Sequence, residues 1–338
     1  MPLCGHGLAG SSSSTPPGGN VYPFMHSTSR FVSPSRSLLS LAFALALLPG
    51  AAHAQACDMG TPTVVPLGFV GSQGYPTLPA IVDGKAADVL LETESRVTLL
   101  NRAPLEKLGV KVRKADTTYA GVDIMVALLS QFTAAGIDAK GYFSVVDKNS
   151  DAVGSLGMGH FLRKDLELWL ANKEMRVSRP TDCRKAFLAS WDPQAHVVDF
   201  KLDSSLRDLR PWFKVRINGT DVNAIIATGS PYSYLDLHTA ARLGIDVEAP
   251  DVAPSGEVIS WREQRMKVWR APVADMAIGD YRVPQASLRI FDMSLSGEMM
   301  VLGLDFLRNH RVLISMSQRR IYISHLGGPT FSDLAPQE

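Results

Sequence analysis

Cysteine is scarce in this chain, with three among 338 residues, and the patterns that mark several enzyme classes are missing. The cysteines and the eight histidines do not fall at zinc-ligand spacing. The sequence has neither a glycine-rich phosphate-binding loop nor a Gly-x-Ser-x-Gly turn. Its net charge is only +1, which gives no basic surface for nucleic acid. We therefore expect no metal, no cofactor and no nucleic-acid partner.

An apolar run near the N-terminus has the features of an export signal. It covers residues 38–48, and Arg30 and Arg36 precede it. A bilayer span needs about 20 apolar residues, so this run is too short to cross a membrane. Ala52-His53-Ala54 then gives a small-x-small cleavage site. The sequence predicts a signal peptide over residues 1–54, a periplasmic or secreted protein, and no transmembrane segment in the mature chain.

Two details of the export signal leave alternatives open. Residues 1–24 are rich in glycine, serine and proline, and Met25 would begin a more ordinary signal peptide, so translation starts at the first methionine or at Met25. Cys57 lies close to the cleavage site, as in a lipoprotein. Ala54 and Gln55 fit a lipobox poorly, so lipidation ranks second to a plain cleaved signal.

Cys57 and Cys183 remain after the leader is removed, and they are 126 positions apart. Disulfides persist in oxidising compartments, which agrees with export. In the chain-entropy model, closing a loop of this length stabilises the fold by roughly 4–5 kcal/mol. We expect a Cys57–Cys183 disulfide.

Two stretches of the chain are alike and recur at matching offsets. The first covers residues 90–100 and the second residues 225–235. A turn pair ends nine positions before the threonine of each stretch, and both pairs suit tight hairpins because their residues tolerate positive φ. The pairs and threonines are Asp83-Gly84 with Thr93, and Asn218-Gly219 with Thr228. The matching predicts an internal duplication.

A short helix is predicted after each stretch. Asn101 and Asp236 are the expected N-caps, and Gly109 and Gly244 are the expected left-handed C-caps. A Leu-Gly segment then recurs further along each copy, and the aspartate of the second one, Asp305, is expected to cap a helix start. Alternating apolar residues follow both segments and predict a pair of strands each time. The two Leu-Gly segments are residues 156–163 and 302–308.

Both stretches resemble the Asp-Thr-Gly-Ala/Ser loop of retropepsin-like and pepsin-like aspartic peptidases. Residues 90–95 are Leu-Leu-Glu-Thr-Glu-Ser, and residues 225–230 are Ile-Ile-Ala-Thr-Gly-Ser. The resemblance, to exported bacterial members in particular, implies a mostly-β, two-lobe aspartic-protease fold built from two retropepsin-like β-barrel repeats. It implies lobes at 55–183 and 211–326, an interlobe linker at 184–210 and a tail at 327–338.

The resemblance also implies that both catalytic aspartates are gone, because Glu92 and Ala227 occupy their positions. An aspartic peptidase needs one carboxyl group from each lobe, and the two share one proton. Ala227 supplies none. The extra methylene of Glu92 displaces its carboxyl group by roughly 1.5 Å, beyond the ~0.5 Å tolerance of a catalytic constellation. We therefore assign no catalytic residue.

Other residues of the loops are expected to keep the scaffold. In the family the loop threonines hydrogen-bond to the opposite loop, which implies the same for Thr93 and Thr228. Glu94 replaces a glycine, and its side chain would strain the backbone if its φ were positive.

Two further groups of residues are assigned by position. The loop residues Ser95, Gly229 and Ser230 are expected to be structural, since the spacing places no base beside either serine. Tyr119 and Trp261 fall where a hairpin flap is expected in each lobe, and we expect them to stabilise their own hairpins rather than to cover a ligand.

These features predict an exported pseudo-peptidase. Its interlobe cleft would bind an extended peptide or a protein partner, because an extended chain can pair with main-chain groups without chemistry. The alternative is an active aspartic-type endopeptidase in which Glu92 pairs with an acid from elsewhere. A second alternative is a structural or assembly protein that acts through its surface.

Overall fold

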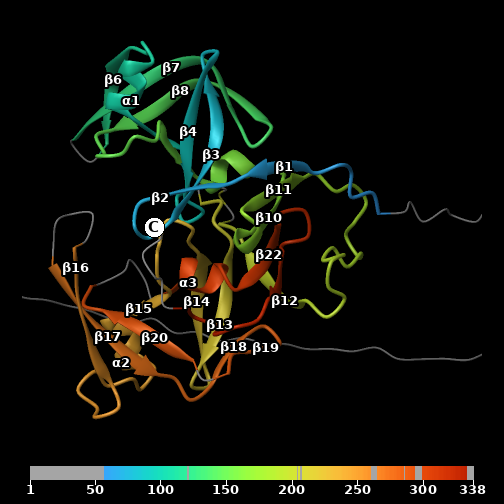
Figure 1. Cartoon of the computed structure of the whole chain (residues 1–338), viewed down its shortest axis with the longest axis vertical. Helices are drawn as coiled ribbons and strands as arrows, with labels where there is room; N and C mark the ends of the chain where they lie inside the picture. Colours follow the sequence, from blue (N-terminus) through green and yellow to red (C-terminus); the bar gives the residue numbers. More distant parts are fainter. Residues whose placement is uncertain are drawn as a thin grey trace, which may run out of the picture. The chain divides into compact units, whose positions relative to one another are not determined.

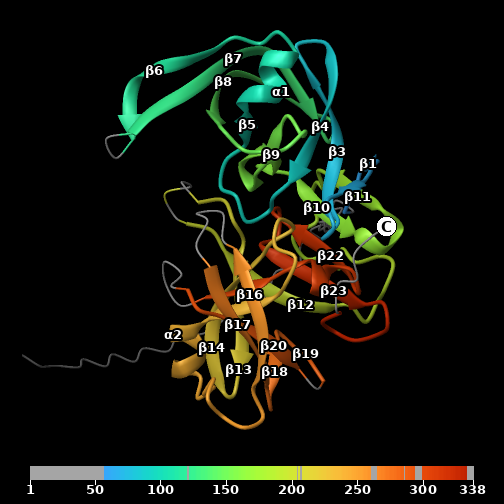
Figure 2. The same ribbon diagram turned by 60° about the vertical axis from the view of Figure 1, so that its left-hand side comes forward.

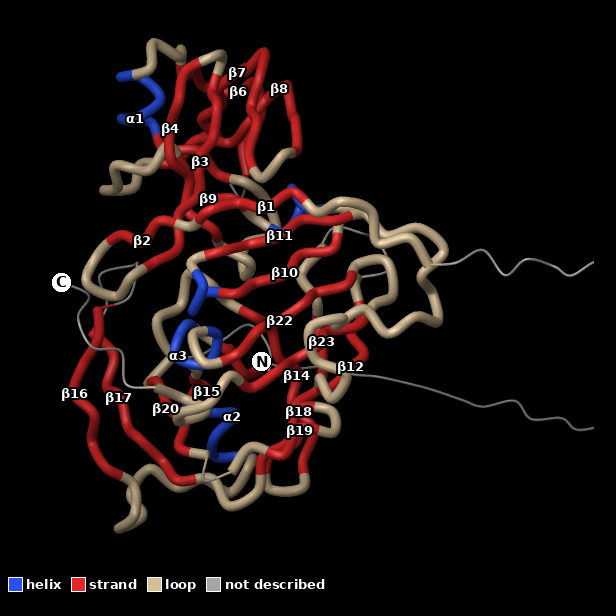
Figure 3. Tube along the Cα trace, turned by 45° about the vertical axis from the view of Figure 1, so that its right-hand side comes forward, coloured by secondary structure: helices blue, strands red, loops and turns tan. Residues whose placement is uncertain are grey.

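Strands make up most of the described part of the chain, and its helices are short (Figure 3). The computed structural model describes residues 57–119, 122–203, 205, 208–259, 265–284, 286–293 and 299–332. Within these ranges no helix has the length and apolar character needed to cross a bilayer. The predicted signal peptide and Trp261 lie outside the described residues.

The N-terminal half forms an eight-stranded sheet (Figure 1). Its strands lie in the order β2, β3, β4, β9, β5, β8, β7, β6. Alternate side chains face the core, among them Leu78, Val89 and Phe132, each at most 1% exposed. The strands are β2 (Gly68–Val70), β3 (Tyr75–Val82), β4 (Lys85–Leu91), β5 (Leu99–Asn101), β6 (Val112–Tyr119), β7 (Val122–Ala134), β8 (Ile137–Val146) and β9 (Gly154–Leu156).

The C-terminal half repeats the strand directions of the N-terminal sheet. β4 is parallel to β9, β9 is antiparallel to β5, and β5 is parallel to β8. In the same order, β14 is parallel to β21, β21 is antiparallel to β15, and β15 is parallel to β20. The strands of this half are β13 (Trp212–Ile217), β14 (Thr220–Ile226), β15 (Tyr234–Asp236), β16 (Ala253–Ile259), β17 (Arg265–Pro272), β18 (Met276–Ile278), β19 (Tyr281–Arg282), β20 (Ser287–Phe291) and β21 (Met299–Leu302).

Six strands connect the two halves and lie between them in Figures 1 and 2. They are β1 (Thr63–Pro66), β10 (Asp165–Trp169), β11 (Glu174–Ser178), β12 (His196–Lys201), β22 (His310–Ser315) and β23 (Arg320–His325). The central contact is antiparallel pairing of β10 with β22, in which Leu166 faces Ile314. β12 lies inside the segment expected to be a linker and pairs with β23. β10 pairs with β11 and β22 pairs with β23, which confirms the strand pairs expected after the Leu-Gly segments.

The predicted turns have the predicted backbone. Asp83 and Gly84 have φ values of 46° and 79° and connect β3 to β4. Asn218 and Gly219 have φ values of 48° and 78° and connect β13 to β14. Positive φ at both central residues is the geometry that matches the twist of a two-residue hairpin.

Both predicted helices form, but their N-caps differ. They are α1 (Arg102–Lys107) and α2 (Leu237–Arg242). The Asp236 side chain caps α2 by accepting the Thr239 N–H at 2.6 Å. The Asn101 side chain does not cap α1, because its amide donates to the Ala152 carbonyl at 2.8 Å. Gly109 and Gly244 have φ values of 78° and 74°, as expected of left-handed C-caps.

The expected role of Asp305 as a helix-start cap is wrong. The short helix α3 (Leu304–Leu307) has Gly303 at its N-cap, so Asp305 lies inside the first turn. Its buried carboxylate accepts the Ser233 N–H at 2.8 Å and the Ser233 hydroxyl at 2.6 Å. Asp305 therefore fixes the chain that follows the second loop.

The two Leu-Gly segments pack on the two loops in the same way. The Met158 N–H donates to the Ser95 carbonyl at 2.9 Å, and the Leu304 N–H donates to the Ser230 carbonyl at 2.8 Å. A Cβ on Gly157 would lie 2.5 Å from the Val97 carbonyl oxygen, and one on Gly303 would lie 2.4 Å from that of Tyr232. Only glycine allows this approach.

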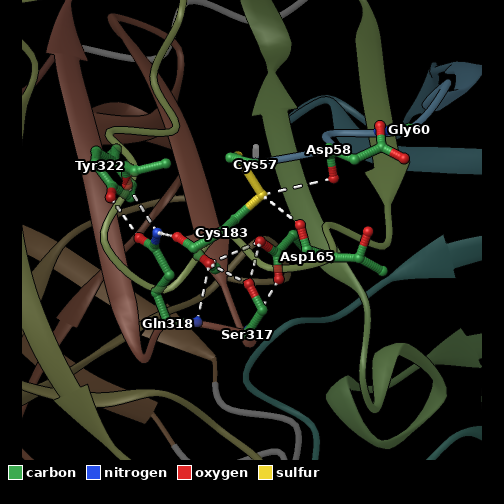
Figure 4. The surroundings of a disulfide bond; sticks show 11 residues. Cys57, Asp58, Gly60, Asp165, Cys183, Ser317, Gln318 and Tyr322 are labelled. Atoms are coloured by element: carbon green, nitrogen blue, oxygen red, sulfur yellow. Dashed lines mark hydrogen bonds between the residues drawn. A yellow bond between two sulfur atoms is a disulfide. The ribbon is translucent and has the colours of Figure 1, made fainter. Parts of the chain in front are cut away.

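A disulfide joins Cys57 to Cys183, whose Cα atoms are 4.4 Å apart (Figure 4). The Gln318 side-chain amide donates to the carbonyl groups of Cys183 and Ala186. The Tyr322 hydroxyl in turn donates to Gln318 Oε1 at 2.5 Å. The bridge thereby ties the start of the described chain to the strands that connect the halves.

Gly157→Ala and Gly303→Ala are expected to destabilise the protein by roughly 2–4 kcal/mol each, because the obstructing atoms are backbone oxygens that cannot rotate away. Urea unfolding checks this. Gly84→Ala is the comparison, since nothing lies within 4 Å of its added Cβ and only its positive φ costs free energy, about 1 kcal/mol. Equal losses at all three positions would contradict the packing argument.

Candidate functional site

The two loops meet through a reciprocal pair of threonines. The Thr93 hydroxyl accepts the Thr228 N–H at 3.1 Å and donates to the Ile226 carbonyl at 2.8 Å. The Thr228 hydroxyl accepts the Thr93 N–H at 3.1 Å and donates to the Leu91 carbonyl at 2.6 Å. Both side chains are buried. Each hydroxyl therefore acts as donor and acceptor, and the loops are fixed face to face.

The residues at the rim of this junction are partly exposed, while those beneath it are buried. Partly exposed are Glu92, Glu94, Ser95, Gly229 and Ser230. Two acidic residues of the first loop therefore lie at the rim, and the second loop presents only a backbone and a hydroxyl.

Glu92 is held by a hydroxyl and an ammonium group. The Ser95 hydroxyl donates to Glu92 Oε2 at 3.0 Å, and Lys148 Nζ lies 3.3 Å from Oε1. The Glu92 side chain keeps 17% of its surface exposed. Ser95 thus orients the Glu92 carboxylate. Sequence reasoning missed Lys148, because it follows β8 and lies 56 positions away.

Glu94 reaches across to the opposite loop. Its Oε2 accepts the Gly229 N–H at 3.2 Å. Neither residue has a positive φ, so the glycine replaced by Glu94 leaves no strained backbone. Gly229 is needed for space instead, since a Cβ there would lie 2.1 Å from Glu94 Oε1 and 3.1 Å from Glu92 Cγ. The two carboxyl groups and Gly229 thus pack as one unit.

Burial and the neighbouring Glu92 carboxylate raise the pKa of Glu94 to about 7. Burial penalises the charged form, and a like charge adds to that penalty. The Gly229 N–H and the more distant Lys148 act in the opposite direction but do not offset it. Glu94 consequently changes charge near neutral pH.

Ala227 lies in an apolar environment. It is 1% exposed and clusters with Ile225, Met299 and Val301. Trp212 and Tyr234 pack against the same cluster. The second loop therefore contributes a methyl group where the two-aspartate mechanism requires a carboxyl group.

Aromatic side chains surround the two glutamates, and the sequence patterns did not indicate them. Burial, followed by Tyr232, Glu94 and Glu92, raises the pKa of Tyr75. Burial and Glu94 raise the pKa of Tyr234 to about 12. These tyrosines stay neutral, and they come from both halves of the chain, because Tyr75 begins β3 and Tyr234 begins β15.

The remaining predicted site residues are placed as follows. The Ser230 hydroxyl donates to the Tyr232 carbonyl at 2.8 Å, which is a local structural role. Tyr119 ends β6 opposite Val122 in the β6–β7 hairpin, which extends from the N-terminal sheet in Figure 2. Trp261 lies outside the described residues, between β16 and β17.

No cluster of His, Cys, Asp and Glu within the described ranges is suited to hold a metal ion. An open hollow of about 720 Å³ lies elsewhere, where Lys214, Arg216, Asp221 and Arg282 are among the lining residues. Its charges pair internally, as in Arg216 with Asp221 at 2.9 Å. We therefore place the candidate site at the loop junction.

Gly229→Ala is expected to cost roughly 1–2 kcal/mol of stability in the wild-type chain, because the new methyl group displaces the Glu94 carboxyl group and breaks its hydrogen bond. In an E94A background the same change should cost less than about 0.5 kcal/mol. Urea unfolding of the four proteins in this double-mutant cycle measures the coupling. Additive losses would contradict the contact between Glu94 and Gly229.

Comparisons with known proteins agree with the geometry of the second loop. Residues 213–309 match the sequence model of a family described as gag-polyprotein putative aspartyl protease. The match runs from β13 through α3 and includes the loop at 227–230. No curated protein matches the chain. The matched segment and its mostly-β fold support the presence of an aspartyl-protease-like domain in this chain.

Proposed function

We propose that the protein is a two-lobed, exported pseudo-peptidase that binds an extended peptide or protein segment in a cleft over the loop junction. The main observation behind this proposal has two parts. The reciprocal hydrogen bonds of Thr93 and Thr228, here called the threonine interlock, hold the two loops together, and Ala227 of the second loop is buried among apolar side chains. The scaffold that positions two carboxyl groups is present, and one of the two groups is missing. Binding needs only the scaffold, because an extended chain gains affinity from main-chain pairing.

Repetition of one unit supports the two-lobe proposal. Each half has a hairpin with positive φ, a threonine loop, a short helix and a Leu-Gly segment packed on the loop. The strand directions agree as well. An internal duplication accounts for all of these with one event. The extra Asp305–Ser233 contact then marks a difference between the copies.

One observation favours a second candidate, an active endopeptidase with a non-standard acid pair. Glu92 and Glu94 lie side by side over Gly229, and their environments differ, since Glu92 has an ammonium partner and Glu94 has a raised pKa. Carboxyl groups with separated proton affinities are suited to act as base and acid. The pair comes from one loop, however, and the tolerance for such constellations is only about 0.5 Å.

Export is proposed from the sequence of the leader, with the mature chain beginning near Gln55. The Cys57–Cys183 disulfide supports it, because such bridges persist outside reducing compartments. Intact mass of the exported protein, with and without reductant, tests the proposal. Two free thiols would contradict the disulfide, and a lipid mass on Cys57 would contradict both the disulfide and the start near Gln55.

The unmodified protein is expected to show no pepstatin-sensitive cleavage of a denatured protein between pH 3 and 7. Pepstatin mimics the tetrahedral intermediate and needs a carboxyl pair that Ala227 cannot complete. The triple variant E92D/E94G/A227D is expected to recover cleavage, and neither E92D nor A227D alone should suffice. Robust pepstatin-sensitive cleavage by the wild type would move the active enzyme to first place. Pepstatin-insensitive cleavage lost in both E92Q and E94Q would favour the one-loop acid pair.

Peptide binding is tested by selection from a displayed library of random peptides with blocked ends that lack Asp, Glu and His. Peptides are expected that bind the wild type and lose at least tenfold in affinity on Ser230→Trp, because the added ring covers the rim of the junction. Lys214→Trp is the matched control, since it places the same side chain at the distant hollow. Circular dichroism verifies folding of both. A selection that yields no peptide sensitive to Ser230→Trp contradicts the proposed function.

A further inference from the structure

Glu94 belongs to the first loop, but its carboxyl group lies against Gly229 of the second loop, two residues after Ala227. It accepts the Gly229 N–H, and the missing Cβ of Gly229 provides its space. The second loop therefore has a carboxyl group beside it, supplied from the other half of the chain. A ligand that covers the junction lies over Glu94, which is partly exposed as a residue although its carboxyl group packs against Gly229.

The charged and titratable groups that face Glu94 come from several elements. Glu92 lies on the same loop, and Lys148 follows β8 with its Nζ 3.3 Å from Glu92. Tyr75 on β3 and Tyr234 on β15 interact with Glu94 and stay neutral. Arg210 contacts the Glu94 carbonyl oxygen at 3.4 Å rather than its carboxyl group.

The Arg210 guanidinium is already occupied. It pairs with Asp208 at 2.6 Å and lies over the Trp212 ring, 4.8 Å from the centroid. Among the charges that act on the Glu94 carboxyl group, the like charge of Glu92 has the larger effect, and the raised Glu94 pKa of about 7 agrees with this arrangement. A proton is the simplest compensation for the charge of Glu94 when water is excluded.

We propose that peptide binding over the loop junction is coupled to proton uptake by Glu94, so that the site selects uncharged extended segments and holds them more tightly below neutral pH. The inference rests on the proposed function. A covering peptide removes water from Glu94, which penalises the carboxylate more than the neutral acid. The protonated acid also gains an O–H donor for a main-chain carbonyl of the peptide.

The test uses synthetic versions of the selected library peptides, which bind the wild type and lose affinity for the Ser230→Trp variant. Fluorescence anisotropy gives Kd at pH 6, 7 and 8 for the wild type and for E94Q, which keeps the shape and the acceptor for Gly229 without a titrating group. The wild-type Kd is expected to rise about tenfold from pH 6 to pH 8, as proton linkage requires for a group that titrates near pH 7. E94Q is expected to bind within twofold of the wild-type pH 6 value throughout. Glu106→Gln, on the exposed face of α1, is the matched control and should keep the wild-type profile.

The outcomes separate the two proposals. A wild-type Kd that does not change with pH, or a pH dependence that persists in E94Q, overturns the coupling while leaving peptide binding intact. Tighter binding at pH 8, with selected peptides rich in Lys or Arg, also overturns it, because the site would then prefer the ionised pair. Failure of the selection itself rejects the proposed function together with this inference. A measurement without peptide checks the titration of Glu94 itself. The Gly229 amide ¹⁵N shift should titrate near pH 7 in the wild type and stay flat in E94Q.

Discussion

Two buried threonine hydroxyls form the constraint on which the rest of the site depends. Thr93 and Thr228 each accept the other's N–H and each donate to a carbonyl of the opposite strand end. Four polar groups that would otherwise be buried without partners are satisfied by two side chains, and an unsatisfied one costs about 1–3 kcal/mol. The threonine interlock fixes the positions of both loops, whichever residues occupy the rim.

The rim is free to vary because it borders solvent. Glu94 lies in the first loop without positive φ, and its side chain finds a donor on the other loop. Ala227 closes the apolar cluster beneath the second loop. Both carboxyl groups at the junction, those of Glu92 and Glu94, therefore belong to the first loop. In the proposed function, this rim sets the conditions under which an extended chain binds.

The sequence predicted the parts of the fold that depend on local chemistry. Asp83-Gly84, Asn218-Gly219, Gly109 and Gly244 marked their turns and caps, because positive φ restricts the residues that can occupy such positions. The N-cap roles predicted for Asn101 and Asp305 were wrong. Their side chains form hydrogen bonds with Ala152 and Ser233, which only the tertiary fold brings near.

The site was only partly predictable for the same reason. The threonines and the two substituted aspartate positions follow from spacing within each loop. Lys148, Tyr75 and Arg210 come from distant segments and have no motif. The contact between Glu94 and Gly229 joins positions 135 apart, so no local pattern could indicate it. The matching offsets of the two stretches predicted that the loops pair, but they did not indicate where the Glu94 side chain points.

The account depends most on the threonine interlock, and a double-mutant cycle of Thr93→Val and Thr228→Val tests it directly. Valine keeps the shape of threonine and removes the hydroxyl. Equilibrium urea unfolding should show a loss of roughly 2 kcal/mol for each single variant. Because each hydroxyl serves the other's backbone, the double variant should lose less than the sum of the two, with a coupling of about 1 kcal/mol or more. Strictly additive losses, or single variants as stable as the wild type, would contradict the interlock and the placement of the site upon it.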